Sequence, residues 1–217
     1  MITTPHSSPA CLYLVRHGPS VWNGRKRVSG QMNPPLSVAG EELARNLALV
    51  MLGRPLTAIY TSTLTRAIAT ARPTAISHKL NIHTHPGLKE WHMGILHGRF
   101  RDTRDPETYH QWQLRKQDMS HFRIPGGETF FELQQRVCAA LRTIWLRETN
   151  GHVLIVGHRS TNRVIMAKLM GWSIETAVSL RLRSKYLYVI TLGIPPSIQT
   201  ICLNPPHTGE QYAGFKA

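Results

Sequence analysis

Two short apolar runs, each followed at once by a histidine and an arginine, constrain the fold of this chain more than any other feature. The runs are 11–15 and 152–156, and the segments that follow them are Arg16–Gly18 and Gly157–Arg159. Both runs are far below the roughly 20 apolar residues that a membrane-spanning helix needs. An apolar run of this length is typical of a parallel strand that is buried on both faces of a sheet.

Amphipathic segments with helix-start signals lie between the strand-like runs. Ser37 is placed to cap a helix that continues to about Met51, and Thr129 and Glu132 have the spacing of a capping box. Pro73 is expected to kink or interrupt a helix that begins near residue 62 or 63. The other expected elements are strands over 56–60, 186–192 and 198–203, a helix over 130–144 and a helix over 161–170.

Strands that alternate with helices predict a largely parallel sheet with helices on both faces. We therefore expect an α/β protein, a three-layer α/β/α sandwich with a mixed, mainly parallel sheet. Residues 95–125 show weak periodicity and many polar groups, and we interpret them as a small helical cap insertion. The 217 residues are expected to form a single domain, with residues 1–9 as a loose tail.

The chain is strongly basic, with 26 Lys and Arg against 12 Asp and Glu and a formal net charge of +14. A basic protein favours anionic partners, and the partner that we expect is a small phosphorylated substrate. The basic residues are dispersed and show no zinc-finger or basic-zipper spacing, so nucleic acid is not a predicted partner. A membrane is not a predicted partner either, and the sequence leaves open whether the chain forms a homodimer.

The cysteines and the N-terminal run indicate the compartment. Cys11, Cys138 and Cys202 are an odd and scattered set, which argues against a disulfide framework and is typical of a reducing environment. The apolar run that begins at Cys11 stops at Arg16, which is too early for the core of a signal peptide. We therefore expect the protein to be cytoplasmic.

The residues that follow the predicted strands converge in such a fold. Ligands of open parallel sheets bind beyond the carboxyl ends of the strands, where Arg16, His17, His158 and the segment 62–66 would meet. Arginine binds phosphoryl oxygens with a planar pair of donors, and neutral imidazole can attack phosphorus to form phosphohistidine. A leaving alkoxide needs a proton, for which Glu90 is the candidate. The pattern predicts phosphoryl transfer.

Several segments of the chain resemble the first branch of the histidine phosphatase superfamily, which includes phosphoglycerate mutase-like enzymes. They occur in the order typical of that family, from residue 12 to residue 170. A single Arg-His-Gly is a weak signal, whereas several ordered segments are a strong one. The segments are Leu14–Asn23 with its Arg-His-Gly, Pro35–Gly40, Tyr60–Ala67, Leu88–Glu90 with Gly94 and Gly98, Pro125–Glu128, and Val156–His158.

The resemblance implies a role for each residue of the expected pocket. His17 is the implied nucleophile, and Glu90 is the implied acid for the leaving group and then the base for water. The family needs no metal, and we expect no cofactor. The implied phosphoryl-binding residues are Arg16, Arg66 and His158, the last as a protonatable cation, and Asn23, Gly18 and Arg159 are further expected substrate-binding residues.

Three positions depart from the family pattern. Pro19 stands where the mutases of the family typically carry Glu, and His97 stands where the family usually has Glu. Arg159 stands where Gly is commonest, so it adds a cation beside the pocket. The sequence leaves open whether Arg159 and His97 contact the substrate.

Other interpretations remain for residues near these segments. Glu107, in the cap region, and Glu128, after it, are alternative candidates for the acid role of Glu90, and Glu128 is equally suited to help cap the helix at Thr129. His83, His85, His92 and His97 lack a fixed metal-ligand spacing and are weak candidates for a metal site. Trp91, Trp112, Phe130 and Phe131 fit core packing better than a substrate wall.

The predicted activity is metal-independent hydrolysis of a small phosphomonoester, such as a sugar phosphate, through a phosphohistidine. A phosphoglycerate-type mutase is the nearest alternative, although the chain lacks the long insertion by which such mutases resemble one another. A catalytically silent member that binds a phospho-ligand or a protein is the alternative of a different class. The presence of His17, Glu90 and His158 favours an active enzyme.

Overall fold

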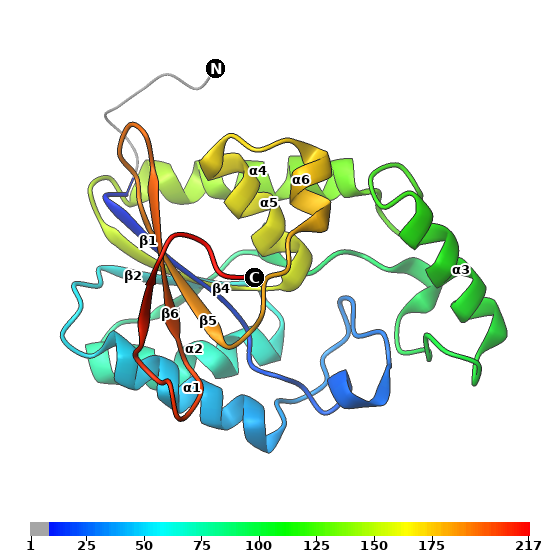
Figure 1. The fold of residues 1–217 in the computed structure, drawn as a ribbon, viewed down its shortest axis with the longest axis horizontal. Helices are drawn as coiled ribbons and strands as arrows, with labels where there is room; N and C mark the ends of the chain where they lie inside the picture. The colour runs from blue at the N-terminus through cyan, green and yellow to red at the C-terminus, as the bar shows by residue number, and fades with distance from the viewer. Residues whose placement is uncertain (1–8) are drawn as a thin grey trace.

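The computed structural model describes residues 9–217, which form a mixed β-sheet with helices on both faces (Figure 1). Within these residues the sheet has seven strands in the order β3-β2-β4-β1-β5-β6-β7. The strands from β3 to β1 are parallel, and β5, β6 and β7 extend the sheet by antiparallel pairing. The predicted α/β/α fold class with a mixed, mainly parallel sheet is confirmed. The strands are β1 (Cys11–Arg16), β2 (Ala58–Thr61), β3 (Ile82–Thr84), β4 (His152–Gly157), β5 (Tyr186–Thr191), β6 (Ser197–Cys202) and β7 (Gln211–Ala213).

The two apolar runs form adjacent central strands. β1 and β4 pair in parallel, with Cys11 opposite His152 and Arg16 opposite Gly157. Leu12 and Leu14 pack into the core on one face of the sheet, and the alternate residues of β1 pack into the core on the other face. Because β1 and β4 end in register, the histidines that follow them emerge side by side.

Two pairs of helices cover the sheet. α1 and α2 lie on one face, below the sheet in Figure 1, and α4 and α5 lie on the opposite face. Each pair buries its apolar stripe against the strands, which is the main stabilising contribution of an amphipathic helix. The helices are α1 (Val38–Met51), α2 (Thr65–His78), α4 (Phe130–Arg147), α5 (Arg159–Met170) and the shorter α6 (Ile174–Ser179).

The predicted helix-start signals are confirmed. The Ser37 hydroxyl accepts a hydrogen bond from the Gly40 N–H (3.3 Å) at the start of α1. At the start of α4, Thr129 Oγ1 accepts from the Glu132 N–H (3.2 Å), and Glu132 Oε2 accepts from the Thr129 N–H (2.8 Å). These side chains satisfy backbone donors that have no partner inside the helix.

Pro73 was expected to kink or interrupt its helix; the interruption is wrong, and the kink stays a prediction. α2 contains Pro73 and continues to His78. Residues on both sides of the proline, including Ala71 and Thr74, are fully buried. The packing of this face against the sheet outweighs the one backbone hydrogen bond that a proline removes from a helix.

Several boundaries differ from those expected. β2 begins at Ala58, α2 begins at Thr65 because Leu64 before it is extended, and α5 begins two residues earlier than expected. α6 and β7 are short elements without a periodic signal and were not predicted. The expected tail over residues 1–9 lies outside the described residues except for Pro9, which is buried.

Residues 95–125 extend to one side of the sheet and contain the helix α3 (Pro106–Gln117), at the right of Figure 1. Asp105 caps this helix by accepting from the Thr108 N–H (3.1 Å), and Arg99 pairs with Asp105 (2.8 Å). The division of one domain into a core and an inserted cap stays a prediction. Short 3₁₀ turns connect the elements: η1 (Asn23–Arg25), η2 (Pro86–Leu88) and η3 (Gly94–Leu96).

A helix that crosses a bilayer must be long and apolar along its whole length. None of the helices within residues 9–217 is both long enough and apolar enough to cross a membrane.

Candidate active site

His17 and His158 meet at the carboxyl edge of the central strands. The His17 N–H donates to the Gly157 carbonyl oxygen (3.0 Å), which extends the parallel ladder one residue beyond β1. The centroids of the two imidazole rings are 5.0 Å apart. Arg66, in the first turn of α2, contacts both rings. The structure therefore brings together the strand-end residues that the sequence predicted to converge.

The hydrogen-bond partners of His17 determine its tautomer. Nδ1 lies 2.7 Å from the Gly18 carbonyl oxygen, which can only accept, so the proton is on Nδ1. Nε2 accepts from Arg66 Nε at 3.1 Å. Burial, together with Arg66 and Arg16, holds the pKa of His17 well below its usual range. His17 is therefore neutral, with the lone pair of a nucleophile on Nε2.

His158 is fully buried and is also neutral. Its Nδ1 accepts from Arg66 Nη2 (3.4 Å), so Nε2 carries the proton and donates to the Ser62 hydroxyl (2.7 Å). Burial and the neighbouring Arg66 and His17 hold the pKa of His158 well below its usual range. This corrects the expectation that His158 adds a positive charge. Burial and the neighbouring Arg66 disfavour protonation of the His158 ring.

Arg66 is buried, and each of its guanidinium nitrogens has a partner. Beside its two histidine contacts, Nη1 donates to the Met32 carbonyl oxygen (2.6 Å) and Nη2 donates to the Gly30 carbonyl oxygen (2.8 Å). Burial lowers the pKa of Arg66 to about 10, so the side chain remains charged at neutral pH. The loop that contains Gly30 and Met32 thus fixes the guanidinium against His17.

Arg16 and Asn23 also line the cavity at this edge. Arg16 Nε is buried and has no hydrogen-bond partner among residues 9–217. Burial and the neighbouring Arg159 lower the pKa of Arg16 to about 10. The Asn23 side-chain oxygen accepts from the Ser20 N–H (2.7 Å) and hydroxyl (2.8 Å), which leaves the amide nitrogen of Asn23 available to the cavity.

Gly18 contributes close packing. Its N–H donates to Thr70 Oγ1 (3.0 Å), and a Cβ at this position would lie 2.5 Å from the Gly40 carbonyl oxygen. A larger residue would separate the start of α1 from the end of β1. Gly18 is not among the residues that line the cavity, so its expected part in substrate binding stays a prediction.

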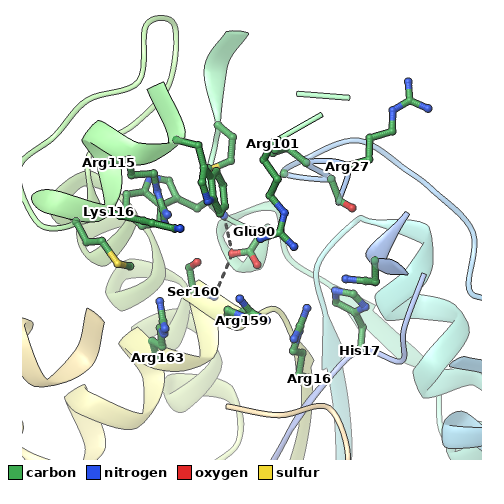
Figure 2. Close-up of a pocket in the computed structure, with 18 of the residues that line it drawn as sticks. Arg16, His17, Arg27, Glu90, Arg101, Arg115, Lys116, Arg159, Ser160 and Arg163 are labelled. Carbon is green, nitrogen blue, oxygen red and sulfur yellow. Dashed lines mark hydrogen bonds between the residues drawn. The ribbon is translucent and has the colours of Figure 1, made fainter. Parts of the chain in front are cut away.

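Glu90 faces the same cavity from the segment that follows η2 (Figure 2). Its Oε1 accepts from the Trp91 N–H (2.9 Å) and from the Ser160 N–H (3.1 Å). The second donor belongs to the first turn of α5, beside Arg159 and His158. These two backbone donors fix one carboxylate oxygen and leave Oε2 for proton transfer.

Arg136 and Glu128 position the Glu90 segment, and the sequence analysis did not assign them this role. Arg136 donates to the carbonyl oxygens of Gly87 (2.8 Å) and Lys89 (3.0 Å), and it pairs with the Glu128 carboxylate. Glu128 Oε1 also accepts from the His92 N–H (2.9 Å). Glu128 therefore does not cap the helix at Thr129. The sequence feature that could have indicated this role is the charge pair of Glu128 and Arg136. It does not predict their backbone partners, because those residues are distant in sequence.

His97 stabilises a loop junction. Its Nε2 accepts from the N–H groups of Gln31 (3.2 Å) and Met93 (2.9 Å), and it does not line the cavity. Burial and His92 lower the pKa of His97 to about 4, so the ring is neutral. Among residues 9–217, no three His, Cys, Asp or Glu side chains are grouped so that they could hold a metal ion.

The cavity has a volume of about 300 Å³ and is lined by eight lysine and arginine residues. Glu90 is the one acidic residue in its lining, within the described part of the chain. Trp91 and Trp112 also line it, whereas Phe130 is in the core and Phe131 is exposed. Sequence reasoning assigned Arg16, Arg66 and Arg159 to the pocket and missed the others, which are Arg27, Arg101, Arg115, Lys116 and Arg163.

The family model of the histidine phosphatase superfamily (branch 1) matches residues 12–194. The chain belongs to this superfamily. The resemblance seen in the sequence segments is thereby confirmed, and the family supports the predicted enzyme class, a phosphoric monoester hydrolase.

Relatives with names and structures agree on the family and the fold. A protein of Serratia proteamaculans named "Probable phosphoglycerate mutase GpmB" is 33% identical over 174 residues, which is 80% of each chain. The alpha-ribazole phosphatase structure from Shigella flexneri has a TM-score of 0.75 at 28% identity and covers 83% of this chain and 89% of that one. YhfR of Bacillus stearothermophilus has a TM-score of 0.76 at 29% identity and covers 83% and 90%.

Proposed function

We propose that this protein hydrolyses a small phosphomonoester, of the sugar phosphate type, through a phosphohistidine at His17. The observation that carries the proposal is the state of His17, a neutral imidazole whose Nε2 lone pair faces the buried guanidinium of Arg66. A bound phosphoryl group would take the place of that contact and accept from Arg66. The nucleophile and the cation that stabilises the transition state are thus side by side before substrate binds.

In the first half-reaction, Nε2 of His17 attacks phosphorus and the bond from phosphorus to the ester oxygen breaks. Arg16, Arg66 and the buried His158 surround the equatorial oxygens, where negative charge accumulates in the transition state. The leaving alkoxide takes the proton of Glu90. Meanwhile the Nδ1–H of His17 keeps its hydrogen bond to the Gly18 carbonyl oxygen, which stabilises the positive charge on the ring.

In the second half-reaction, the Glu90 carboxylate removes a proton from a water molecule, and the water oxygen attacks the phosphorus. The bond between phosphorus and Nε2 of His17 breaks, orthophosphate leaves, and Glu90 is again protonated. A carboxyl group with one oxygen fixed by backbone donors is suited to both proton transfers. The cavity cations supply the electrostatic stabilisation, so we propose that the cycle needs no metal ion.

Hydrolysis is preferred to a mutase reaction because of the residue at position 19. A mutase must protect its phosphohistidine from water, and the position where mutases typically carry Glu holds Pro19, which has no carboxylate. The named relatives point in both directions, because the Serratia protein is named as a mutase and the Shigella protein as a phosphatase.

The cysteines of this chain are free, which agrees with the proposed cytoplasmic location.

The test is phosphate release from glucose 6-phosphate with and without a bisphosphate primer such as 2,3-bisphosphoglycerate. We expect turnover without the primer, and a rapid quench with labelled substrate should trap an acid-labile, base-stable phosphoenzyme. A strict requirement for the primer would assign the protein to the mutases. Binding of the ester without any turnover would assign it to the silent members of the family.

A further inference from the structure

The cavity continues well beyond the residues that the proposed cycle uses. Figure 2 shows Arg115, Lys116 and Arg163 on the side of Glu90 opposite to His17. Together with Arg101 and Arg159 they form a group of five cations, which we call the distal cationic wall. Arg101 and the two α3 residues come from the cap, and Arg159 and Arg163 are one turn apart at the start of α5.

Glu90 and Asp102 are near enough to act on the wall arginines electrostatically, but neither forms an ion pair with one of them. The ion pairs found in residues 9–217 involve none of its five members. The other arginines of the cap pair with acidic side chains, namely Arg99 with Asp105, Arg104 with Asp102 and Arg123 with Glu132, and none of these arginines lines the cavity. The cap therefore has acidic partners for its arginines outside the cavity and places its unpaired ones in the cavity.

Arg115 is built into the wall. Its side chain is only 6% exposed, and its Nε is buried without a hydrogen-bond partner among the described residues. The guanidinium lies over the Trp91 ring (4.1 Å to the centroid) and near the Trp112 ring (5.0 Å). Cation–π contacts orient an arginine but leave its in-plane N–H donors unused. A buried donor without a partner costs free energy that an anionic ligand would recover.

Arg163 is held in a similar way. It is 9% exposed, and its Nε donates to the Leu180 carbonyl oxygen (2.8 Å), which leaves its two terminal nitrogens for the cavity. Burial and the positive charges of neighbouring wall residues lower the pKa of both Arg115 and Arg163 to about 10, and the charge of Glu90 opposes this shift. Both side chains remain charged at neutral pH, so the unliganded wall contains mutual repulsion.

We propose that the distal cationic wall binds a second phosphate group, and that the substrate is a small bisphosphorylated metabolite. The inference rests on the proposed function, because one phosphate must still reach His17. A single carboxylate would neutralise one of the five wall cations, whereas a phosphate carries nearly two negative charges and three acceptor oxygens for the forked donors of Arg115 and Arg163. A cavity of about 300 Å³ accommodates a small metabolite and excludes a folded partner.

The test compares three esters of one hexose, namely glucose 6-phosphate, 6-phosphogluconate and glucose 1,6-bisphosphate. We expect kcat/KM for phosphate release to be about tenfold or more higher for the bisphosphate than for the monophosphate, with the carboxylate in between. Equal values for all three would overturn the proposal. A preference for 6-phosphogluconate over the bisphosphate would overturn it in favour of a carboxylate subsite.

Two variants connect the preference to the wall. Lys116→Met removes an exposed wall cation that the fold does not need, and Arg115→Met removes the buried one. We expect the ratio of kcat/KM for the bisphosphate to kcat/KM for the monophosphate to fall about threefold in Lys116→Met and about tenfold in Arg115→Met. Arg142→Met, at an exposed arginine of α4 outside the cavity, is the matched control and should leave the ratio unchanged. An unchanged ratio in a folded Lys116→Met and Arg115→Met pair would overturn the proposal.

Binding to a variant that cannot react separates this inference from the proposed function. His17→Asn should bind glucose 1,6-bisphosphate more tightly than glucose 6-phosphate in calorimetry, and Lys116→Met added to it should reduce the difference. If wild type releases phosphate through His17 but shows no such difference, only the distal subsite is wrong. If His17→Asn still turns substrate over, the proposed function is wrong whatever the wall binds.

Discussion

The two ends of the cavity are built in different ways. At the reaction end, the ring nitrogens of His17 and His158 and each guanidinium nitrogen of Arg66 have partners within the protein, and Arg16 Nε is the buried donor without one among the described residues. At the distal end, Arg115 Nε has no partner either, and no wall residue forms an ion pair within residues 9–217. The first arrangement fixes reacting atoms before substrate binds, whereas the second leaves donors for the ligand to satisfy. The reacting groups and the cations proposed to bind the second phosphate are therefore held by different contacts within one cavity.

The supporting elements explain this difference. The reaction end stands on β1 and β4, whose register is fixed by hydrogen bonds along their whole length. The distal end stands partly on the start of α5 and partly on α3, which has few buried residues and packs against Trp91 through Arg115. Strand ends allow little variation in position, and a peripheral helix allows much more.

The largest expected effect is at the nucleophile. His17→Ala should lower kcat/KM for p-nitrophenyl phosphate by at least about a thousandfold, because no other group can form the covalent intermediate. The variant should also yield no trapped phosphoenzyme. Circular dichroism checks that the fold is retained. Turnover near the wild-type value in a folded His17→Ala protein would refute the mechanism.

The next largest effect is expected at Glu90, the proposed proton donor to the leaving group. Glu90→Gln keeps the shape of the side chain but cannot donate a proton to the leaving group. In single-turnover experiments, phosphorylation by glucose 6-phosphate should slow by about a hundredfold, and phosphorylation by p-nitrophenyl phosphate should slow much less because nitrophenolate leaves without a proton. Equal losses for the two esters would remove Glu90 from the acid role.

Acid should destabilise the reaction end and leave the distal arginines charged. The pKa of His17 and that of His158 are lower in the folded state than the unperturbed value of about 6.5, so below that pH the unfolded chain binds more protons. Stability should fall as the pH decreases from 6.5, by up to about 1.4 kcal/mol per pH unit for each histidine. Denaturant titration between pH 7 and pH 5 measures this, and His158→Asn should flatten the slope. An unchanged slope would contradict the assignment.

A smaller effect is expected where the two ends meet. Arg159 is the member of the distal cationic wall that also acts on the reaction end, because its charge lowers the pKa of Arg16 as well as that of Arg163. Arg159→Gly should raise KM for glucose 1,6-bisphosphate by about fivefold and raise it less for p-nitrophenyl phosphate. Equal increases would mean that Arg159 acts on the shared phosphoryl group rather than on the second anion.

The smallest effect is the one expected from chelation. Arginines supply the positive charge that a metal ion provides in other phosphoryl-transfer sites. Activity toward p-nitrophenyl phosphate should therefore survive dialysis against excess EDTA, and vanadate should compete with the substrate. Loss of activity on dialysis, followed by recovery with one divalent metal, would show that the cycle depends on a metal ion.

Prediction from sequence succeeded where the interactions are local or follow chain order. The buried runs became β1 and β4, and the capping signals at Ser37 and Thr129 are present as expected. It failed at Pro73, where tertiary packing preserves the helix, and at His158, whose charge depends on cations from other segments. Hydrogen bonds between distant segments have no local signature in the chain.

The sequence by itself determined the layered fold and the identity of the reacting groups. Apolar runs of strand length select a buried parallel sheet, and the residues directly after them must then share one edge. Only the tertiary structure decided the protonation of the two histidines, the clamp of Arg136 and Glu128 on the Glu90 segment, and the unpaired cations of the distal wall. Each of these depends on burial and on charges brought together from different elements, and neither quantity is contained in the order of the residues.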